Sequence, residues 1–277
     1  MKLHLPRLLA AAVLASLVAV PAYTAEIPDE YKDKTVLVWD ADYLADYASN
    51  ASTDYIAFLL GLDIEVPSDI SLDGGNLYFT SRNAQLPVSI DFTGSNSSAL
   101  QNLSSVVFDN LSGLSFASYK ERAIYTSGKL VIQNVTDGVE DSENPDVLFT
   151  GNSITTTSSD TYGGAIRASS GVSITGNGDV TFTGNTATAT TSSSYDVIYS
   201  YGGAIYASSG GVSISGNGDV SFLGNSISSC DSRGGAIYTF SGVCITGNGD
   251  VIFTGNSASS PESSPGSSRG SSRGSSR

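Results

Sequence analysis

The chain has 277 residues, of which 14% are charged, and its 27 acidic residues outnumber its 13 basic ones. This length suits one or two domains, and the weakly charged, Gly-rich composition is typical of a folded chain rather than a disordered one. The acidic balance argues against nucleic-acid partners and against electrostatic docking on anionic lipid, because both depend on basic side chains.

Residues 1–25 are predicted to be a secretory signal peptide. The basic residues Lys2 and Arg7 precede an apolar run at 8–20, which is too short to span a bilayer comfortably. Small residues suited to a cleavage site follow this run. An uncleaved anchor is the alternative. Cleavage removes His4, the only histidine, so the exported chain cannot build a Ser-His-Asp or Cys-His catalytic system or a histidine metal site. We therefore expect no enzyme, no metal and no cofactor.

Residues 26–70 show no repeat. Thr35–Trp39 is β-branched and aromatic, which favours a strand. Within 41–62, apolar residues recur at roughly helical spacing, which favours one amphipathic helix. We interpret 26–70 as an N-terminal cap, because the first turn of a repeat array needs its open edge covered.

Residues 71–256 form the predicted repeat domain, with clear copies over 149–256. A Gly-Gly-Ala-Ile segment alternates with Phe-x-Gly-Asn, and a decayed version reaches back to about 74. The motif residues are Gly163, Gly164, Ala165, Ile166, Phe182 and Asn185; Gly202, Gly203, Ala204, Ile205, Phe222 and Asn225; and Gly234, Gly235, Ala236, Ile237, Phe253 and Asn256. Three short apolar alternations in each copy predict an all-β, right-handed parallel β-helix of about three to five coils.

Alternation along each predicted strand assigns the side chains to faces. Val212, Ile214, Val220 and Phe222 share one parity and should point inward, together with Ile205. The residue after each first-strand isoleucine should then face outward, which makes a column of Arg167, Tyr206 and Tyr238, extended by Tyr125. This column is either a ligand-contacting strip, with a cation–π contact between Arg167 and Tyr206, or ordinary surface.

Three further patterns have both a structural and a chemical interpretation. The asparagines at 152, 185, 225 and 256 recur at a bend and are expected to form a hydrogen-bonded ladder. The Gly-Asn-Gly-Asp tetrads at 176–179, 216–219 and 247–250 are expected to be solvated turns, with a shared cation as the alternative. Cys230 and Cys244, the two cysteines, form either a disulfide, unbridged thiols or intermolecular bonds.

The alternation of Gly-Gly-Ala-Ile with Phe-x-x-Asn resembles the repeat of the chlamydial polymorphic outer membrane proteins. This resemblance implies an autotransporter whose β-helical passenger is displayed on the surface of a Gram-negative type bacterium and acts in adhesion. A C-terminal β-barrel is also implied, but residues 257–277 are instead a Ser/Gly/Arg-rich tail, expected to be disordered. We therefore expect a truncated or fragmentary reading frame.

The function expected from the sequence is thus a surface-exposed or secreted adhesin, located at the cell outer membrane or outside the cell. Its expected partner is an unidentified host-cell or extracellular ligand, and the last coil is expected to favour edge-to-edge self-association. A β-helical polysaccharide lyase or hydrolase is the alternative, which would need two carboxylates, or a carboxylate with a basic residue, converging on a groove.

Overall fold

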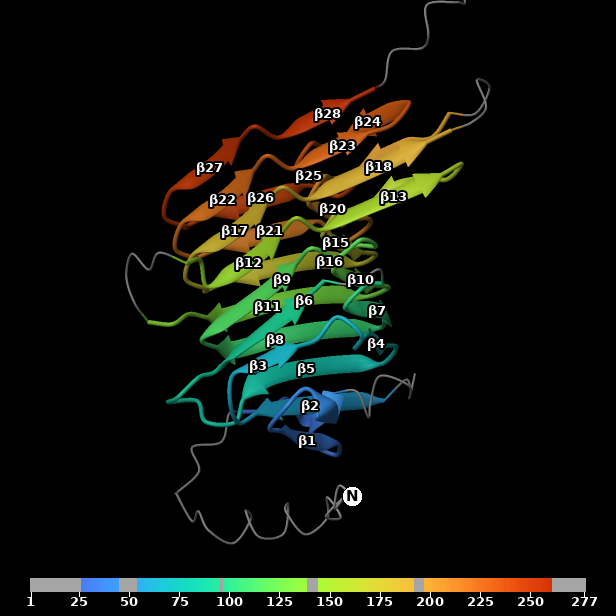
Figure 1. Ribbon diagram of the computed structural model, residues 1–277. Helices are drawn as coiled ribbons and strands as arrows, with labels where there is room; N and C mark the ends of the chain where they lie inside the picture. The colour runs from blue at the N-terminus through green and yellow to red at the C-terminus, as the bar shows by residue number, and fades with distance from the viewer. Residues whose placement is uncertain (1–25, 45–53, 95–96, 139–143, 192–196, 261–277) are drawn as a thin grey trace, which may run out of the picture.

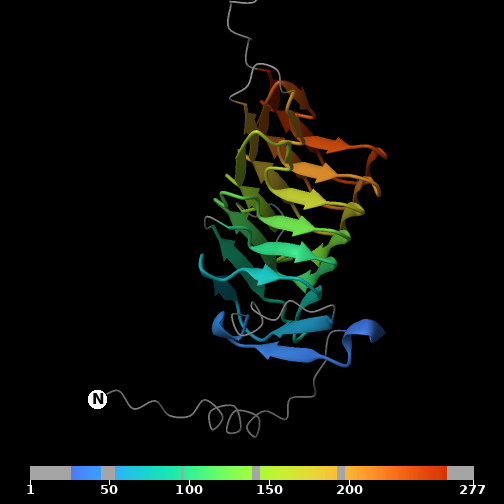
Figure 2. The same ribbon diagram turned by 90° about the vertical axis from the view of Figure 1, so that its right-hand side faces the viewer.

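The computed structural model describes residues 26–44, 54–94, 97–138, 144–191 and 197–260. Over these ranges the chain winds into a stack of short strands along a single axis, from β1 at the N-terminal end to β28 at the other (Figures 1 and 2). One short 3-10 helix, η1 (Asp29–Tyr31), precedes the first strand. None of the helices described is long and apolar enough to cross a membrane.

Three parallel sheets form the wall of the solenoid, and from β2 onward the chain visits them in turn. Sheet 1 contains β1 (Thr35–Val38), β2 (Tyr55–Leu60), β5 (Asn76–Ser81), β8 (Ser105–Leu111), β11 (Lys129–Val135), β16 (Gly171–Thr175), β21 (Val212–Ser215) and β26 (Val243–Thr246). Sheet 2 contains β3 (Ile64–Val66), β6 (Ser89–Thr93), β9 (Gly113–Ala117), β12 (Val147–Thr150), β17 (Val180–Thr183), β22 (Val220–Leu223) and β27 (Val251–Thr254). Sheet 3 contains β4 (Leu72–Asp73), β7 (Leu100–Leu103), β10 (Ile124–Thr126), β15 (Ile166–Ala168), β20 (Ile205–Ala207) and β25 (Ile237–Thr239). The predicted parallel β-helix is confirmed.

The N-terminal region differs from the expected cap. Strands β1, β2 and β3 belong to the same sheets as the clear repeats, so the solenoid begins at Thr35 and has more coils than the three to five predicted. Within the range predicted as a helix, residues 42–44 are helical, 45–53 lie outside the described residues, and Tyr55–Leu60 is strand β2.

The physical reason is that β2 is buried on both faces. Phe58 points into the core, whereas Ala57 packs on the outer side against Tyr31 of η1 and Tyr78 of the next coil. A strand covered on both sides is a continuous apolar run, and such a run cannot be distinguished from a helix by its periodicity.

The core is a set of side-chain columns that run along the axis. All five residues predicted to point inward in the middle coil are buried: Ile205, Val212, Ile214, Val220 and Phe222. The phenylalanines of sheet 2 stack ring on ring from Phe116 to Phe253, with ring centroids 4.8–4.9 Å apart. This spacing equals the distance between neighbouring strands, so each ring sits directly on the ring of the coil below.

Two asparagine ladders run parallel to these columns. In the predicted ladder, which joins Asn152, Asn185, Asn225 and Asn256, each side-chain Nδ2 donates to the Oδ1 of the next coil at 2.9 Å. This prediction is confirmed. A second ladder joins the tetrad asparagines Asn177, Asn217 and Asn248 at 2.9 and 2.8 Å. The tetrad turns are therefore partly buried hydrogen-bonding elements rather than simply solvated ones.

The segments that follow the Phe-x-Gly-Asn motifs form two further parallel sheets, which we call the arm. Sheet 4 contains β13 (Ser153–Thr157), β18 (Thr186–Thr190), β23 (Ser226–Ser228) and β28 (Ser257–Ser259), and it continues outward from sheet 2 (Figure 1). Sheet 5 contains β14 (Thr161–Tyr162), β19 (Tyr199–Tyr201) and β24 (Asp231–Arg233), and it returns to sheet 3. Buried apolar side chains, including Ala187, Ala189, Ile198 and Ile227, lie within the arm.

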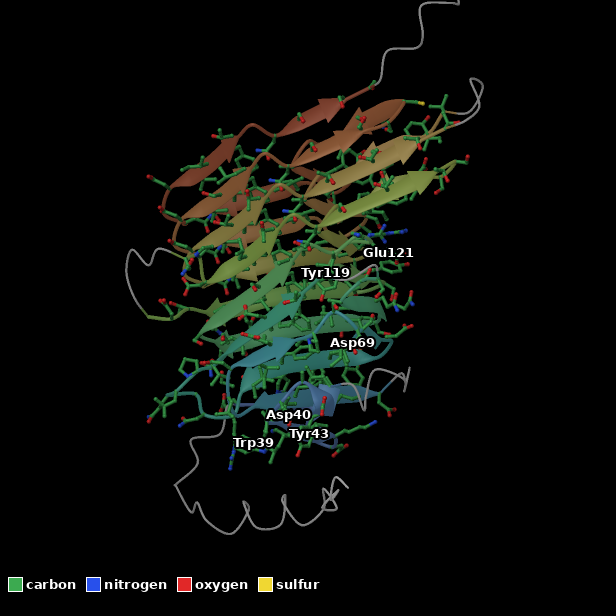
Figure 3. The ribbon with its side chains drawn as sticks, in the orientation of Figure 1. Trp39, Asp40, Tyr43, Asp69, Tyr119 and Glu121 are labelled. Atoms are coloured by element: carbon green, nitrogen blue, oxygen red, sulfur yellow. The ribbon has the colours of Figure 1, made fainter. Side chains whose placement is uncertain are left out.

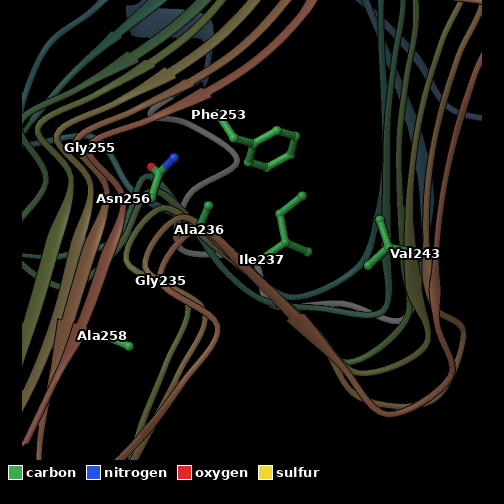
Figure 4. A pocket seen from close by; sticks show the side chains of 8 residues that line it. All are labelled: Gly235, Ala236, Ile237, Val243, Phe253, Gly255, Asn256 and Ala258. Carbon is green, nitrogen blue, oxygen red and sulfur yellow. The ribbon is translucent and has the colours of Figure 1, made fainter.

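The two ends of the stack differ in how the core is covered. At the N-terminal end, Leu44 is fully buried, and Trp39, Asp40 and Tyr43 lie at the same end of the stack (Figure 3). At the other end, Ile237, Val243 and Phe253 line an open hollow (Figure 4), and Phe253 is 48% exposed whereas Phe222 one coil below is 0% exposed. No described strand pairs with the outer edges of β25, β26, β27 or β28.

Candidate functional site

The outward side of sheet 3 carries one column of large side chains. Tyr125, Arg167, Tyr206 and Tyr238 are consecutive partners in the parallel register of β10, β15, β20 and β25. Their neighbours at the preceding position are the isoleucines that face the core, so alternation sends the four side chains to the opposite side. The structure therefore brings together Arg167, Tyr206 and Tyr238, the three residues singled out from the sequence.

Sheet 5 of the arm lies against this column and supplies a second set of tyrosines. The ring of Tyr162 is 4.8 Å from that of Tyr206, and the ring of Tyr201 is 4.9 Å from that of Tyr238. Tyr206 is consequently only 6% exposed. The predicted strip is thus one side of a larger cluster, which we call the aromatic face: Tyr125, Tyr162, Arg167, Tyr199, Tyr201, Tyr206, Arg233, Tyr238 and Phe240.

The paired glycines of the repeat place these two sheets side by side. Gly202 has a φ of +67°, a conformation that residues with a side chain rarely adopt, and it turns the chain from sheet 5 into sheet 3. Gly203 has no such φ, but a Cβ there would lie 2.0 Å from the carbonyl oxygen of Gly235 in the next coil. The first glycine of the pair therefore makes the corner, and the second permits close stacking of the coils.

The cationic side chains of the aromatic face have different partners. The Arg167 guanidinium lies 4.5 Å from the ring centre of Tyr162 and 4.8 Å from that of Tyr125. The expected cation–π contact with Tyr206 is not the one formed, because Tyr162 of the arm takes that place over the guanidinium. Arg233 instead makes two hydrogen bonds to Asp231, at 3.0 and 2.9 Å.

A second arginine lies one coil below Arg167. Arg122 occupies the register position of the second glycine in Gly163–Gly164, adopts a φ of +82°, and lies 5.7 Å from the ring centre of Tyr125. Burial, followed by the nearby charge of Arg167, lowers the pKa of Arg122 to about 10. The side chain therefore remains a cation at neutral pH.

Three tyrosine hydroxyls of the aromatic face, those of Tyr162, Tyr201 and Tyr206, have a raised pKa and stay protonated at neutral pH. Burial raises the pKa of Tyr162 to about 12, and the hydrogen bond that its hydroxyl donates to Asp160 acts in the same direction. Burial also raises the pKa of Tyr206, against the opposing effect of Arg167. The face consequently offers neutral rings with hydroxyl groups, together with cationic guanidinium groups.

The aspartates of the tetrads act as backbone acceptors. A carboxylate oxygen of Asp179 accepts the backbone N–H of Asp219 at 2.7 Å, Asp219 accepts that of Asp250 at 2.7 Å, and Asp146 accepts that of Asp179 at 2.9 Å. Among the residues whose positions are described, no group of three or more His, Cys, Asp or Glu side chains is arranged to hold a metal ion. The cation alternative for the tetrads therefore receives no geometric support.

The two cysteines lie near the open end of the stack. Cys244 on β26 pairs in register with Ser213, and both Cys230 and Cys244 are exposed. No disulfide joins them in this structure. Of the three alternatives left open by the sequence, the intrachain bond is therefore the one that the structure does not contain.

Several members of the aromatic face could not be identified from the single-strand pattern. Tyr162, Tyr201 and Arg233 each stand immediately before a Gly-Gly pair. This shared position before the glycines could have indicated that the three residues belong together. It places them on the aromatic face only because sheet 5 folds back onto sheet 3. Phe240 follows the end of β25 and lies 5.2 Å from the ring centre of Tyr238.

Comparison with known proteins bears on the repeats themselves. Residues 179–208 and 219–239 match the Chlamydia polymorphic membrane protein repeat. The matched ranges include two Phe-x-Gly-Asn segments, 182–185 and 222–225, and two Gly-Gly-Ala-Ile segments, 202–205 and 234–237. The family resemblance expected from these motifs is therefore confirmed. No match was found among curated proteins or among solved structures.

Proposed function

We propose, from the premise that this chain carries repeats of the Chlamydia polymorphic membrane protein family, that it is a surface-displayed passenger that acts as an adhesin. The family is one of outer-membrane, autotransporter-type surface proteins, which supports a location at the cell surface. The adhesive role and export by residues 1–25 are parts of this proposal.

The aromatic face is the observation that carries the adhesive role. It presents tyrosine rings and a phenylalanine on a scaffold that is fixed by parallel strands and asparagine ladders. Phe240 at its edge is 65% exposed. Aromatic side chains on a rigid support offer large contact areas at a low cost in conformational entropy, as is typical of recognition surfaces.

The alternative of a polysaccharide lyase or hydrolase gains no support from this face. Its two neighbouring carboxylates, Asp160 and Asp231, are engaged in holding the structure together. Asp160 accepts hydrogen bonds from the Tyr162 hydroxyl and from the Tyr199 backbone N–H, and Asp231 binds Arg233. We therefore retain the adhesin as the single proposal.

Two measurements test it together. Protease treatment of intact cells should remove the chain, which requires surface display, and the purified full chain should bind host cells or mucin in a saturable manner. Phe240→Ala should weaken this binding, whereas Leu86→Ala should not, because Leu86 is equally prominent (69% exposed) but lies away from the aromatic face. Protection from the protease together with a lack of binding would exclude the adhesin role.

A further inference from the structure

We infer that Arg122, Tyr125, Tyr162 and Arg167, here called the arginine–tyrosine cluster, bind the anionic group of a saccharide bearing a sulfate or a carboxylate. This inference rests on the proposed adhesin function and names the chemical class of its ligand. The cluster lies at the end of the aromatic face nearer the N-terminus, where sheet 5 begins with β14.

The geometry of the cluster places two cations next to one another. The Arg167 guanidinium lies between the rings of Tyr125 and Tyr162, at 4.8 and 4.5 Å, and the Arg122 guanidinium lies 5.7 Å from the same Tyr125 ring. Two like charges held around one ring repel each other; burial is the main cause that lowers the pKa of Arg122, and the nearby charge of Arg167 lowers it further. An anion placed between them would relieve that repulsion.

Neither guanidinium has a protein acceptor among the residues described. The Nε atoms of Arg122 and Arg167 are both shielded from solvent and have no hydrogen-bond partner, and neither arginine takes part in an ion pair. Arg122 is 8% exposed, whereas part of Arg167 remains accessible. A guanidinium carries five N–H donors, and a buried one without acceptors is costly, so these groups are poised to receive oxygen atoms from a ligand.

The contrast with the third arginine of the aromatic face is informative. Arg233 is exposed, yet it donates two hydrogen bonds to the carboxylate of Asp231 in the same strand. In a chain with 27 acidic and 13 basic residues, carboxylates are plentiful as partners. Two carboxylates beside the cluster form no ion pair with its arginines among the residues described: Glu121 exerts only the smallest of the effects on the pKa of Arg122, and Asp160 accepts hydrogen bonds from Tyr162 and Tyr199.

The surroundings favour a saccharide with a single anionic group. Tyr162 stacks on Tyr201 with ring centroids 5.4 Å apart, which continues the aromatic surface away from the arginines. A sugar ring lying on these tyrosines would place a sulfate or carboxylate near the guanidinium groups, which bind planar or tetrahedral oxyanions well. Densely charged polymers would be repelled by a chain whose formal net charge is −14.

The test uses the full chain and three matched probes: 3′-sialyllactose, which carries a carboxylate, 3′-sulfolactose, which carries a sulfate, and neutral lactose. Titration calorimetry or ligand-observed NMR should show binding of at least one anionic probe, at least about tenfold tighter than lactose and weakened by added salt. The two anionic probes distinguish the carboxylate from the sulfate as the preferred group.

Substitutions then assign the binding to the cluster. Arg167→Gln should weaken binding about tenfold and the double variant Arg122→Gln/Arg167→Gln about a hundredfold, because each removes a charge-assisted donor set. Arg82→Gln should leave it unchanged, since Arg82 lies over Trp39 on another part of the solenoid, outside the aromatic face. Arg122→Lys, which keeps the charge at the buried position, should retain more binding than Arg122→Gln, and a melting curve for each variant verifies that it is folded.

The inference would be overturned if lactose bound as tightly as both anionic probes, or if the folded Arg167→Gln variant bound them as the unsubstituted chain does. Its failure is distinguishable from that of the adhesin proposal. A chain that binds host cells normally but does not distinguish the probes remains an adhesin without this site. A chain that is protected from the protease on intact cells and binds no host cell or mucin fails as an adhesin, whatever its affinity for the saccharides.

Discussion

Asn185 donates its side-chain Nδ2 to Oδ1 of Asn225 at 2.9 Å, and the backbone N–H of Asn185 donates to the same oxygen at 3.1 Å. Each asparagine thus connects its own coil to the next by two hydrogen bonds. The Nδ2 of Asn185 is also within 2.9 Å of the Phe149 carbonyl oxygen in the coil below. One side chain therefore links three successive coils, which explains why the motif ends in asparagine.

Replacing this residue tests how much the ladder contributes. Asn185→Ala should lower the free energy of unfolding by about 3–5 kcal/mol, because Phe149 and Asn152 lose partners while fully buried. Asn256→Ala is the matched control and should cost less, about 1–2 kcal/mol: Phe222 and Asn225 also lose partners, but these bonds at the last coil are only half-buried, so water can replace them. Urea unfolding of both variants measures the difference, and equal losses would show that the ladder adds little beyond one local turn.

The glycine pair provides a test of coil stacking. A Cβ on Gly164 would lie 2.2 Å from the Gly203 carbonyl oxygen of the next coil, so Gly164→Ala should prevent normal stacking and destabilise the fold by more than about 3 kcal/mol. A Cβ on Gly184 meets nothing within 4 Å, although its φ is +61°. Gly184→Ala should therefore cost only about 1–2 kcal/mol of backbone strain. Thermal unfolding that ranks the two variants in the opposite order would contradict this reasoning.

The phenylalanine column allows the same substitution to be compared at a covered and an open position. Phe182→Ala should cost about 3–5 kcal/mol, because the ring is fully buried between Phe149 and Phe222. Phe253→Ala removes the same atoms from the open end, where the ring is 48% exposed, and should cost about half as much or less. Denaturant unfolding gives both values. The Phe253 variant should also associate less at high concentration, as light scattering would show, because it reduces the apolar surface beside unpaired strand edges.

The wall of the solenoid could be predicted from the sequence because the alternation and spacing of the motif residues indicate which side chains point inward and which stack. Val212 and Ile214 alternate with serine and so identify an inward face, and the recurrence of Asn225 at a fixed distance from Phe222 indicates stacking. The arm was not accessible in this way. Its strand Thr186–Thr190 alternates threonine with alanine, which is a weak sequence pattern, and the inward side of this strand is defined only by the structure, in which Ala187 is fully buried.

The candidate site was predicted in part for the same reason. Arg167, Tyr206 and Tyr238 share a position in one strand, so their column follows from register alone. Tyr162 approaches from a different sheet, and its contact with Arg167 depends on the turn at Gly163, which single-strand alternation does not describe. Arg122 was hidden because it replaces a glycine of the motif in a decayed coil.

Asp146 should make the stability of the protein depend on acid pH in a predictable direction. The carboxylate is buried and accepts the backbone N–H groups of Asp137 and Asp179, at 2.6 and 2.9 Å. Burial raises the pKa of Asp146 above its ordinary value of 3.8, the two N–H bonds oppose this, and the charges of Asp137 and Asp179 reinforce it. At pH values between 3.8 and the raised pKa, which we call the titration window, the folded state therefore holds a proton that the unfolded chain has lost.

The sign of the effect follows from that difference in bound protons. At pH values well below 3.8 the Asp146 carboxyl group is protonated in both the folded and the unfolded state, and it does not influence stability through its charge. As the pH rises through the titration window, the folded state loses stability relative to the unfolded chain, and above the folded-state pKa this loss is complete and constant. Asp146→Asn removes the titration but leaves the other carboxylates in place. The free energy of unfolding of the unsubstituted protein minus that of Asp146→Asn should thus decrease as the pH rises from about 3 towards neutrality. Urea unfolding at a series of pH values measures this difference, and an increase over the same range would mean that the N–H bonds to Asp137 and Asp179, rather than burial, determine the ionisation of Asp146.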